Sequence, residues 1–310
     1  MEISVFVLTK DRCDKLIETI KSVQKQTVKP KEIVVVDNGS SDETSEMVNK
    51  LFPEIHLIRL HKNFGIITGR NIGIKNCKGE IIFFFDDDAE LLNDYTFSKV
   101  LNLFKSKQEI GVVTLNIKDL KNTLKFNNKE DYIETVSFSG GVSFIRKELF
   151  NEVGMFDDQF YTRAEENDFS LRLLNLGYSV IALPSIKVLH KVLPKRETNI
   201  AKYYSFRNKS IILLRYFPIK YILIEFTWHF LNNLINSIKT GWILLFIKGL
   251  YEVVFKVKIE RKLISNRCLL KYLQLKSHEY STNNSTGFFS YLKSKFINYI
   301  TEFIQKEKDV

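Results

Sequence analysis

The sequence contains few cysteines, prolines and glycines: its 310 residues include 3, 5 and 13 of them, respectively. Cys13, Cys77 and Cys268 are widely spaced and odd in number, so they predict neither a disulfide framework nor a zinc site, and a reducing compartment is expected. So little glycine and proline excludes collagen. Hydrophobic residues make up 45% of the chain and charged residues 26%, which is typical of a globular protein and not of a disordered one.

Long hydrophobic runs are also missing. The first apolar stretch, residues 3–8, is too short for the core of a signal peptide, and no small-residue cleavage site follows it. Between residues 210 and 258 the chain is rich in apolar residues, but its longest uncharged stretch, 226–238, contains three asparagines and does not suit a membrane span. We therefore expect a cytoplasmic protein.

The net charge of +10 is distributed unevenly along the chain. Residues 1–200 carry 28 Lys and Arg against 29 Asp and Glu, whereas residues 201–310 carry 18 against 7. This asymmetry predicts a near-neutral domain over residues 1–205 and a basic extension over residues 206–310. The basic residues are spread over apolar segments without a recognition motif, so we expect no nucleic-acid binding.

In the first two hundred residues, short apolar runs alternate with segments of helical periodicity. The runs at residues 3–8, 33–36, 55–60 and 81–85 predict strands, and the alternation indicates an α/β fold with a mostly parallel sheet flanked by helices. Polar clusters follow three of these runs, at residues 9–12, 37–40 and 86–88. Open α/β sheets bind ligands at the carboxyl ends of their strands, so one cleft is expected to collect all three clusters. Two further strands, 178–183 and 186–189, are predicted on either side of Pro184.

Asp86, Asp87 and Asp88 place three carboxylates at the end of a strand without polar residues. Their mutual repulsion would raise their pKa values unless a cation is present. Hard divalent cations prefer oxygen ligands and often bridge to substrate phosphates. A metal site is the favoured interpretation, and a solvated acidic turn is the alternative.

Several segments, in the order in which they occur, resemble family 2 glycosyltransferases of the GT-A (Rossmann-like) fold. They cover roughly residues 3–215 and include Thr9-Lys10-Asp11-Arg12, Asp37-Asn38-Gly39-Ser40, Gly69-Arg70-Asn71, Asp86-Asp87-Asp88, Ser139-Gly140-Gly141, Glu165-Glu166-Asn167-Asp168, His190 and Arg207-Asn208. Any one of these segments alone would be weak evidence for the family. Together they make coincidence improbable.

The resemblance implies a nucleotide-sugar donor and a divalent metal, Mn²⁺ or Mg²⁺. It assigns the metal to Asp86, Asp88 and His190, and it places Asp37 on the nucleobase. The residues implied to contact the nucleotide-sugar are Thr9, Arg12, Asp37, Arg70, Asn71, Asp86 and Asp87. The alternatives to ligand binding are structural: Asp37 would be an ordinary turn residue, and His190 would be a core or sheet-edge residue.

The resemblance also implies a catalytic base in the segment 165–168. The family usually carries Glu-Asp there, with the aspartate as base, and Glu166 stands at that position. Because its side chain is one methylene longer, the choice between Glu166 and Glu165 stays open. For Asp168 an ion pair with Arg172, four residues further along the helix, is the favoured interpretation.

In the basic extension, apolar residues recur at helical spacing from Ile222 to Ile238, with lysines off that stripe. This pattern predicts amphipathic helices that either bind an anionic membrane surface or pack against protein. A final amphipathic helix is predicted over residues 288–304.

The predicted function is an inverting, metal-dependent transfer of a single sugar, from a UDP- or TDP-linked donor to a hydroxyl of a glycan or lipid-linked acceptor, in cell-surface polysaccharide or glycoconjugate synthesis. A processive synthase is disfavoured because the chain lacks the Q-x-x-R-W motif. The alternatives are a catalytically silent membrane-associated scaffold and a sugar-1-phosphate nucleotidyltransferase. The latter needs a glycine-rich phosphate loop after the first strand, and residues 9–12 contain no glycine.

Overall fold

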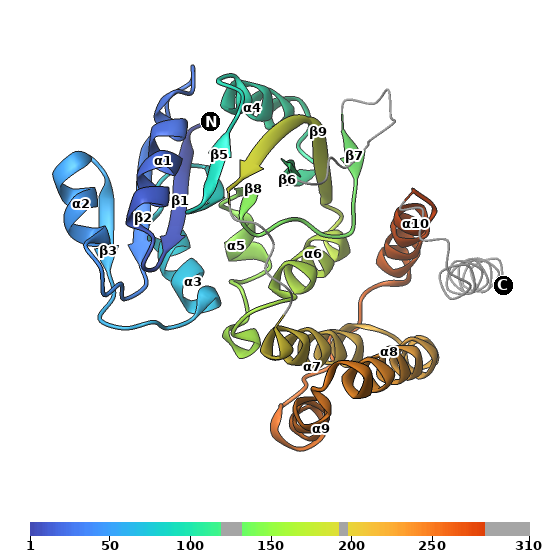
Figure 1. The fold of residues 1–310 in the computed structure, drawn as a ribbon. Coiled ribbons are helices and arrows are strands. Elements are labelled where there is room, and N and C mark those ends of the chain that lie inside the picture. Colours follow the sequence, from blue (N-terminus) through green and yellow to red (C-terminus); the bar gives the residue numbers. More distant parts are fainter. Residues whose placement is uncertain (119–131, 192–197, 283–310) are drawn as a thin grey trace. The chain divides into compact units, whose positions relative to one another are not determined.

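A computed structural model describes residues 1–118, 132–191 and 198–282 (Figure 1). The chain divides into two compact units. The first comprises Met1–Tyr161 and Leu176–Pro194, and the second comprises Thr162–Asn175 and Lys195–Val310. The division at residue 205 that charge asymmetry predicts stays a prediction.

The first unit is built on one mixed sheet with the strand order β3-β2-β1-β4-β8-β6-β9-β5, and β7 pairs with β9 (Figure 1). Strands β1 to β4 run parallel, and β8 is antiparallel to both β4 and β6. The mixed, mostly parallel sheet predicted from the sequence is confirmed. The strands are β1 Ile3–Thr9, β2 Glu32–Asp37, β3 His56–Arg59, β4 Ile81–Asp86, β5 Ala89–Leu91, β6 Ile110–Lys118, β7 Ile133–Glu134, β8 Val142–Arg146 and β9 Ser179–His190.

Helices flank this sheet, and side chains that alternate along each strand supply both apolar layers. On one face, Phe83 and Phe85 of β4 join a core to which α1 and α4 also contribute. On the other face lies Phe6, and a Cβ on Gly73 of α3 would come within 2.0 Å of its ring, so glycine permits the close approach of α3 to β1. The helical segments of this unit are α1 Cys13–Gln24, α2 Thr44–Leu51, α3 Ile66–Asn76, α4 Thr96–Ser106, α5 Leu149–Glu152 and η1 Asp158–Phe160.

The last strand along the chain, β9, differs from its prediction. Two strands were expected on either side of Pro184, but β9 runs without a break from Ser179 to His190. Its pairing with β6 contains a register shift at Leu115/Asn116 that leaves residues 184–186 unpaired on that side, so the proline sits in a bulge and removes no ladder hydrogen bond.

The second unit is helical. Its segments are α6 Glu165–Asn175, α7 Asn199–Tyr216, α8 Ile219–Thr240, α9 Ile243–Tyr251, the π-helical turn η2 Glu252–Lys256 and α10 Asn266–Thr282. Phe206 of α7, Trp242 and Phe246 form an aromatic core, against which Phe230 and Leu234 of α8 pack. These two residues belong to the apolar stripe predicted for residues 222–238, so part of that stripe packs inside its own unit.

The C-terminal end of that stripe is accessible to solvent, because Ile238 is 66% exposed. No helix in the described part of the chain combines the length and the apolar content needed to cross a bilayer. The helix predicted over residues 288–304 lies outside the described residues.

Candidate active site

The carboxyl ends of three neighbouring parallel strands bring the predicted polar clusters together in the first unit. Thr9, the last residue of β1, is in register with Asp37, the last residue of β2. On the other side of β1, Leu8 is in register with Asp86, the last residue of β4. This edge of the sheet therefore carries the polar termini of β2, β1 and β4 side by side.

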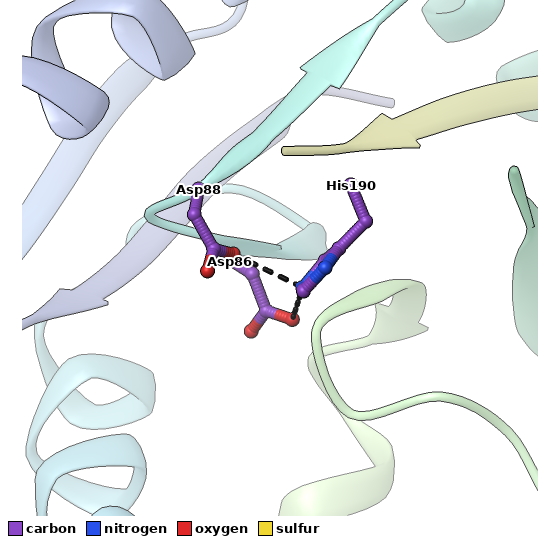
Figure 2. Close-up of side chains that lie close together, drawn as sticks. All are labelled: Asp86, Asp88 and His190. Carbon is purple, nitrogen blue, oxygen red and sulfur yellow. Dashed lines mark ion pairs between the residues drawn. The ribbon is translucent and has the colours of Figure 1, made fainter. Parts of the chain in front are cut away.

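Asp86, Asp88 and His190 converge at this edge (Figure 2). His190 Nε2 lies 3.1 Å from Asp88 Oδ1 and 3.8 Å from Asp86 Oδ2. One ligand atom from each of the three side chains lies within 4.8 Å of the others. The histidine reaches the acidic turn because β5, which follows Asp88 directly, pairs with β9 and places Ala89 opposite His190.

The donor set fits a divalent cation. Two carboxylate oxygens and one imidazole nitrogen suit Mn²⁺, and the carboxylates alone would suit Mg²⁺, which prefers oxygen ligands. Asp86 is accessible to an incoming ion, since 41% of its side-chain surface is exposed. In the described part of the chain, this is the one group of three or more acidic, histidine or cysteine side chains arranged to hold a metal.

Arg12 forms ion pairs with the acidic turn, residues 86–88. Its Nη1 donates to Asp87 Oδ1 at 2.8 Å and to Asp88 Oδ2 at 2.5 Å. Thr9 Oγ1 donates to the other oxygen of Asp87 at 2.8 Å. Asp87 is thus held from both sides, and Asp88 keeps its Oδ1 on the side of His190. Sequence reasoning placed Thr9 and Arg12 along the nucleotide and did not foresee these contacts.

The three carboxyl groups differ electrostatically. Asp86 is partly exposed, but the protein around its carboxyl group displaces water and so raises its pKa, although the charge of Arg70 opposes the shift. Burial also raises the pKa of Asp87 to about 6, against the opposing effects of Arg12 and Thr9. For Asp88 burial acts in the same direction, but the hydrogen bonds and charges of His190 and Arg12 outweigh it, and the net effect lowers the pKa.

Gly141, just before β8, packs directly against Asp86. Its carbonyl oxygen accepts a hydrogen bond of 2.7 Å from the Asp86 backbone N–H. A Cβ at this position would lie 1.8 Å from Asp86 Oδ2, so only glycine leaves room for the carboxylate in its present orientation. The glycine pair noted in the sequence therefore borders the candidate metal ligands.

Other residues predicted to contact the nucleotide-sugar lie deeper in the fold. Asp37 is fully buried and accepts hydrogen bonds from the backbone N–H of Ser40, at 2.8 Å, and from the hydroxyl of Ser45. Asn71 is 7% exposed, and its amide donates to the carbonyl of Phe156 at 2.9 Å. The predicted roles of Asp37, Arg70 and Asn71 toward the nucleotide stay predictions.

The predicted base lies in the second unit, at the start of α6. Glu165 is buried and Glu166 is partly exposed, and both stand in the first turn, where the helix dipole favours negative charge. The residues just before them, Arg163 and Ala164, have φ values of 69° and 66°, a backbone region that non-glycine residues seldom occupy. Asn208 of α7 donates its side-chain amide to the carbonyls of Thr162, at 2.7 Å, and Arg163, at 2.9 Å.

Asn208 is a residue whose role sequence reasoning missed. It stands in the Arg207-Asn208 segment of the resemblance, but nothing in the sequence says that its amide would hold the backbone before Glu165. Asp168, by contrast, lies where it was predicted: it accepts from Arg172 Nη2 at 2.7 Å. It also accepts from the Tyr216 hydroxyl at 2.7 Å.

The first unit combines a mixed α/β sheet with an acidic edge that could hold a divalent metal, and sequence comparison assigns the family. The glycosyl transferase family 2 profile matches residues 4–163, more than half of the chain. The chain belongs to glycosyltransferase family 2.

Two curated relatives match the chain over most of their own length. One is the dTDP-rhamnosyl transferase RfbF of Shigella flexneri, 28% identical in an alignment 213 residues long that covers 58% of this chain and 70% of the relative. The other is the uncharacterized glycosyltransferase YwdF of Bacillus subtilis, 29% identical in an alignment 206 residues long that covers 61% of this chain and 74% of the relative.

Solved structures share the fold at low sequence identity. Residues 1–349 of S. aureus TarS in complex with UDP align with a TM-score of 0.54 at 20% identity, covering 99% of this chain and 92% of that one. GalNAc-T7 with UDP, GalNAc and Mn²⁺ aligns with a TM-score of 0.56 at 18% identity, covering 69% of this chain but only 47% of that one. The GT-A fold is thereby confirmed.

Proposed function

We propose that this glycosyltransferase moves one sugar from a UDP- or TDP-linked donor to a hydroxyl of a glycan or lipid-linked acceptor, with inversion and with the help of a divalent cation. The convergence of Asp86, Asp88 and His190 carries this proposal. A catalytically silent scaffold would leave this group of three possible metal ligands without a role. The name of the Shigella relative, a dTDP-rhamnosyl transferase, supports a TDP-linked donor, and the UDP in the TarS structure supports a UDP-linked one.

On this proposal, the acidic edge holds the donor. Asp86, Asp88 and His190 would hold the cation, which would supply Lewis-acid stabilisation of the departing nucleotide diphosphate. Arg12 and Thr9 fix the acidic turn so that Asp88 keeps one oxygen toward His190. Asp37, whose carboxylate is bonded to Ser40 and Ser45 in this structure, would hold the nucleoside with the residues near it, and Arg70 and Asn71 would contact the phosphates.

The base of the proposed reaction is Glu166, with Glu165 as the alternative. A carboxylate in the first turn of a helix is stabilised in its ionised form and can take a proton from an attacking hydroxyl. Glu166 is the more accessible of the two, because Glu165 is only 3% exposed. A single displacement with one base inverts the configuration at the sugar carbon.

The proposed acceptor and location follow from the relatives and from the basic extension. A Campylobacter jejuni relative, 38% identical over 96 residues but matched over only 31% of its length, is named as a glucosyltransferase acting on an undecaprenol-linked glycan. The excess of 18 Lys and Arg over 7 Asp and Glu in residues 201–310 favours contact with an anionic membrane surface, where such acceptors reside.

Calorimetric titration of UDP, TDP and GDP tests the proposal, with Mn²⁺ and then with EDTA, in the wild type and in Asp88→Ala. We expect one nucleotide to bind in a metal-dependent manner and the variant to lose this binding. If none of the three nucleotides binds with Mn²⁺, the transferase proposal fails and the scaffold takes its place.

A further inference from the structure

The outward face of α9 and η2 carries a continuous apolar stripe. Leu244 is 80% exposed and Phe255 is 71% exposed, and the side chains between them on the same face are also at least half exposed. Successive members from Leu244 to Val254 lie three or four residues apart, and Phe255 lies four residues after Tyr251, so they share one side of the helix. We call this set the α9 stripe: Leu244, Ile247, Tyr251, Val254 and Phe255.

The opposite face of the same segment is already occupied. Phe246, Gly249 and Val253 are buried. Phe246 packs against Phe206 with 4.6 Å between ring centroids. The helix is therefore apolar on two opposite sides, although only one side packs within its unit. An apolar stripe of this extent on a protein surface marks a contact site and not a random exposure.

The charges beside the stripe are positive. Lys248, Lys256 and Lys258 are exposed, and Lys256 lies over the ring of Tyr251 at 6.0 Å from its centroid. Glu252 is the one acidic residue between positions 243 and 258. It does not offset these lysines, because it accepts from the Tyr203 hydroxyl at 2.6 Å and from Arg207 Nε at 2.9 Å.

We propose that the α9 stripe lies in the plane of an anionic lipid bilayer, with its apolar side chains among the acyl chains and its lysines at the phosphate level. The segment is too short to cross: nine residues of α9 and five of η2 span about 20 Å, against a hydrocarbon core of about 30 Å. An apolar stripe bordered by lysines is the pattern of an interfacial helix. The stripe carries no charged side chain, its one polar group is the Tyr251 hydroxyl, and the exposed charges beside it are those of lysines, which complement anionic headgroups.

This inference rests on the membrane contact of the proposed function and assigns it to one surface. The test is co-sedimentation of the full chain with vesicles of phosphatidylcholine alone and of phosphatidylcholine with phosphatidylglycerol, without nucleotide or metal. We expect binding to the anionic vesicles that weakens with salt. The double variant Leu244→Ser with Phe255→Ser should bind at least about tenfold less, and so should Lys248→Glu with Lys256→Glu.

The matched control is Ile219→Ser with Ile238→Ser, which removes two side chains of α8 that are each 66% exposed. It should bind vesicles like the wild type. Equal loss in this control would overturn the assignment to α9, and so would equal binding to neutral and anionic vesicles. A dimer that the stripe variants abolish, in a protein that binds no vesicles, would show that a second copy covers the stripe. Because nucleotide is absent from the assay, vesicle binding and nucleotide binding fail independently.

Discussion

Replacing Gly141 by alanine tests whether the Asp86 carboxylate, in its present orientation, is part of a metal site. The new methyl group would lie 1.8 Å from Asp86 Oδ2 and 2.1 Å from its Cγ. Gly141 is not among the glycines with positive φ, so alanine can adopt its backbone conformation. The Asp86 side chain must therefore turn aside, while the strand keeps its place.

The expected effects on stability and on metal binding differ in size. Forcing a side chain off its rotamer costs about 0.5–1.5 kcal/mol. In a domain of this size each 1 kcal/mol lowers the melting temperature by about 2–4 °C, so the expected drop is about 1–6 °C. Misdirecting a metal ligand costs about 10–100-fold in metal affinity. We expect a folded protein whose Mn²⁺ affinity is lower by that factor.

Mn²⁺ binding is measured from the electron paramagnetic resonance signal of the free ion, with UDP or TDP present at the same concentration for every variant, and stability is measured from thermal unfolding. The control is Gly111→Ala in β6 of the same sheet, where the added methyl group meets the flexible end of Leu149 at 2.9 Å. It should leave Mn²⁺ binding unchanged. Wild-type Mn²⁺ affinity in Gly141→Ala would refute the assignment of Asp86 as a ligand in this orientation.

Three further variants follow from the site. Glu166→Gln should lower the rate of sugar transfer from a radiolabelled donor by about 10²–10⁴-fold while nucleotide binding persists; if Glu165→Gln has this effect instead, the base is Glu165. Arg12→Ala removes the guanidinium that binds two acidic side chains, and we expect Mn²⁺ affinity, measured as above, to fall by about 10–100-fold, with partial recovery in Arg12→Lys. Asp168→Asn leaves two arginines without their buried carboxylate and should lower the free energy of unfolding, measured in urea, by about 3–5 kcal/mol. A loss below about 1 kcal/mol, as for a surface ion pair, would contradict a stabilising role for these buried ion pairs.

The parts of the fold that could be predicted are those whose local pattern carries the full signal. The buried strand 81–85 and the helix that begins near Glu165 and ends before Gly177 are clear from apolar runs and helical periodicity alone. The strand β5 has only three residues, too few for any periodicity, and its pairing with β9 defines it. The continuity of β9 through Pro184 depends on a bulge against β6, which local sequence does not reveal.

The candidate site divides in the same way. The grouping of Asp86, Asp88 and His190 was expected from the family resemblance and from the common edge of parallel strands. The contacts of Arg12 with the acidic turn were not, because they join residues 75 and 76 positions apart and depend on how a loop side chain turns. The burial of Asp37 was not foreseen either, since Ser45 lies on the following helix and its hydroxyl reaches back to the carboxylate.

The charges at this edge explain why the proposed reaction would need a cation. Asp86, Asp87 and Asp88 bring three negative charges when ionised, and Arg12 and Arg70 act on them with two positive ones. The residual negative charge would repel a donor diphosphate by about 4 kcal/mol for each pair of charges 4 Å apart at an effective dielectric constant of 20. A divalent cation reverses that sign, and the neutral form of His190 adds a ligand without adding charge. Metal and diphosphate then bind as one unit, so neither should bind tightly without the other.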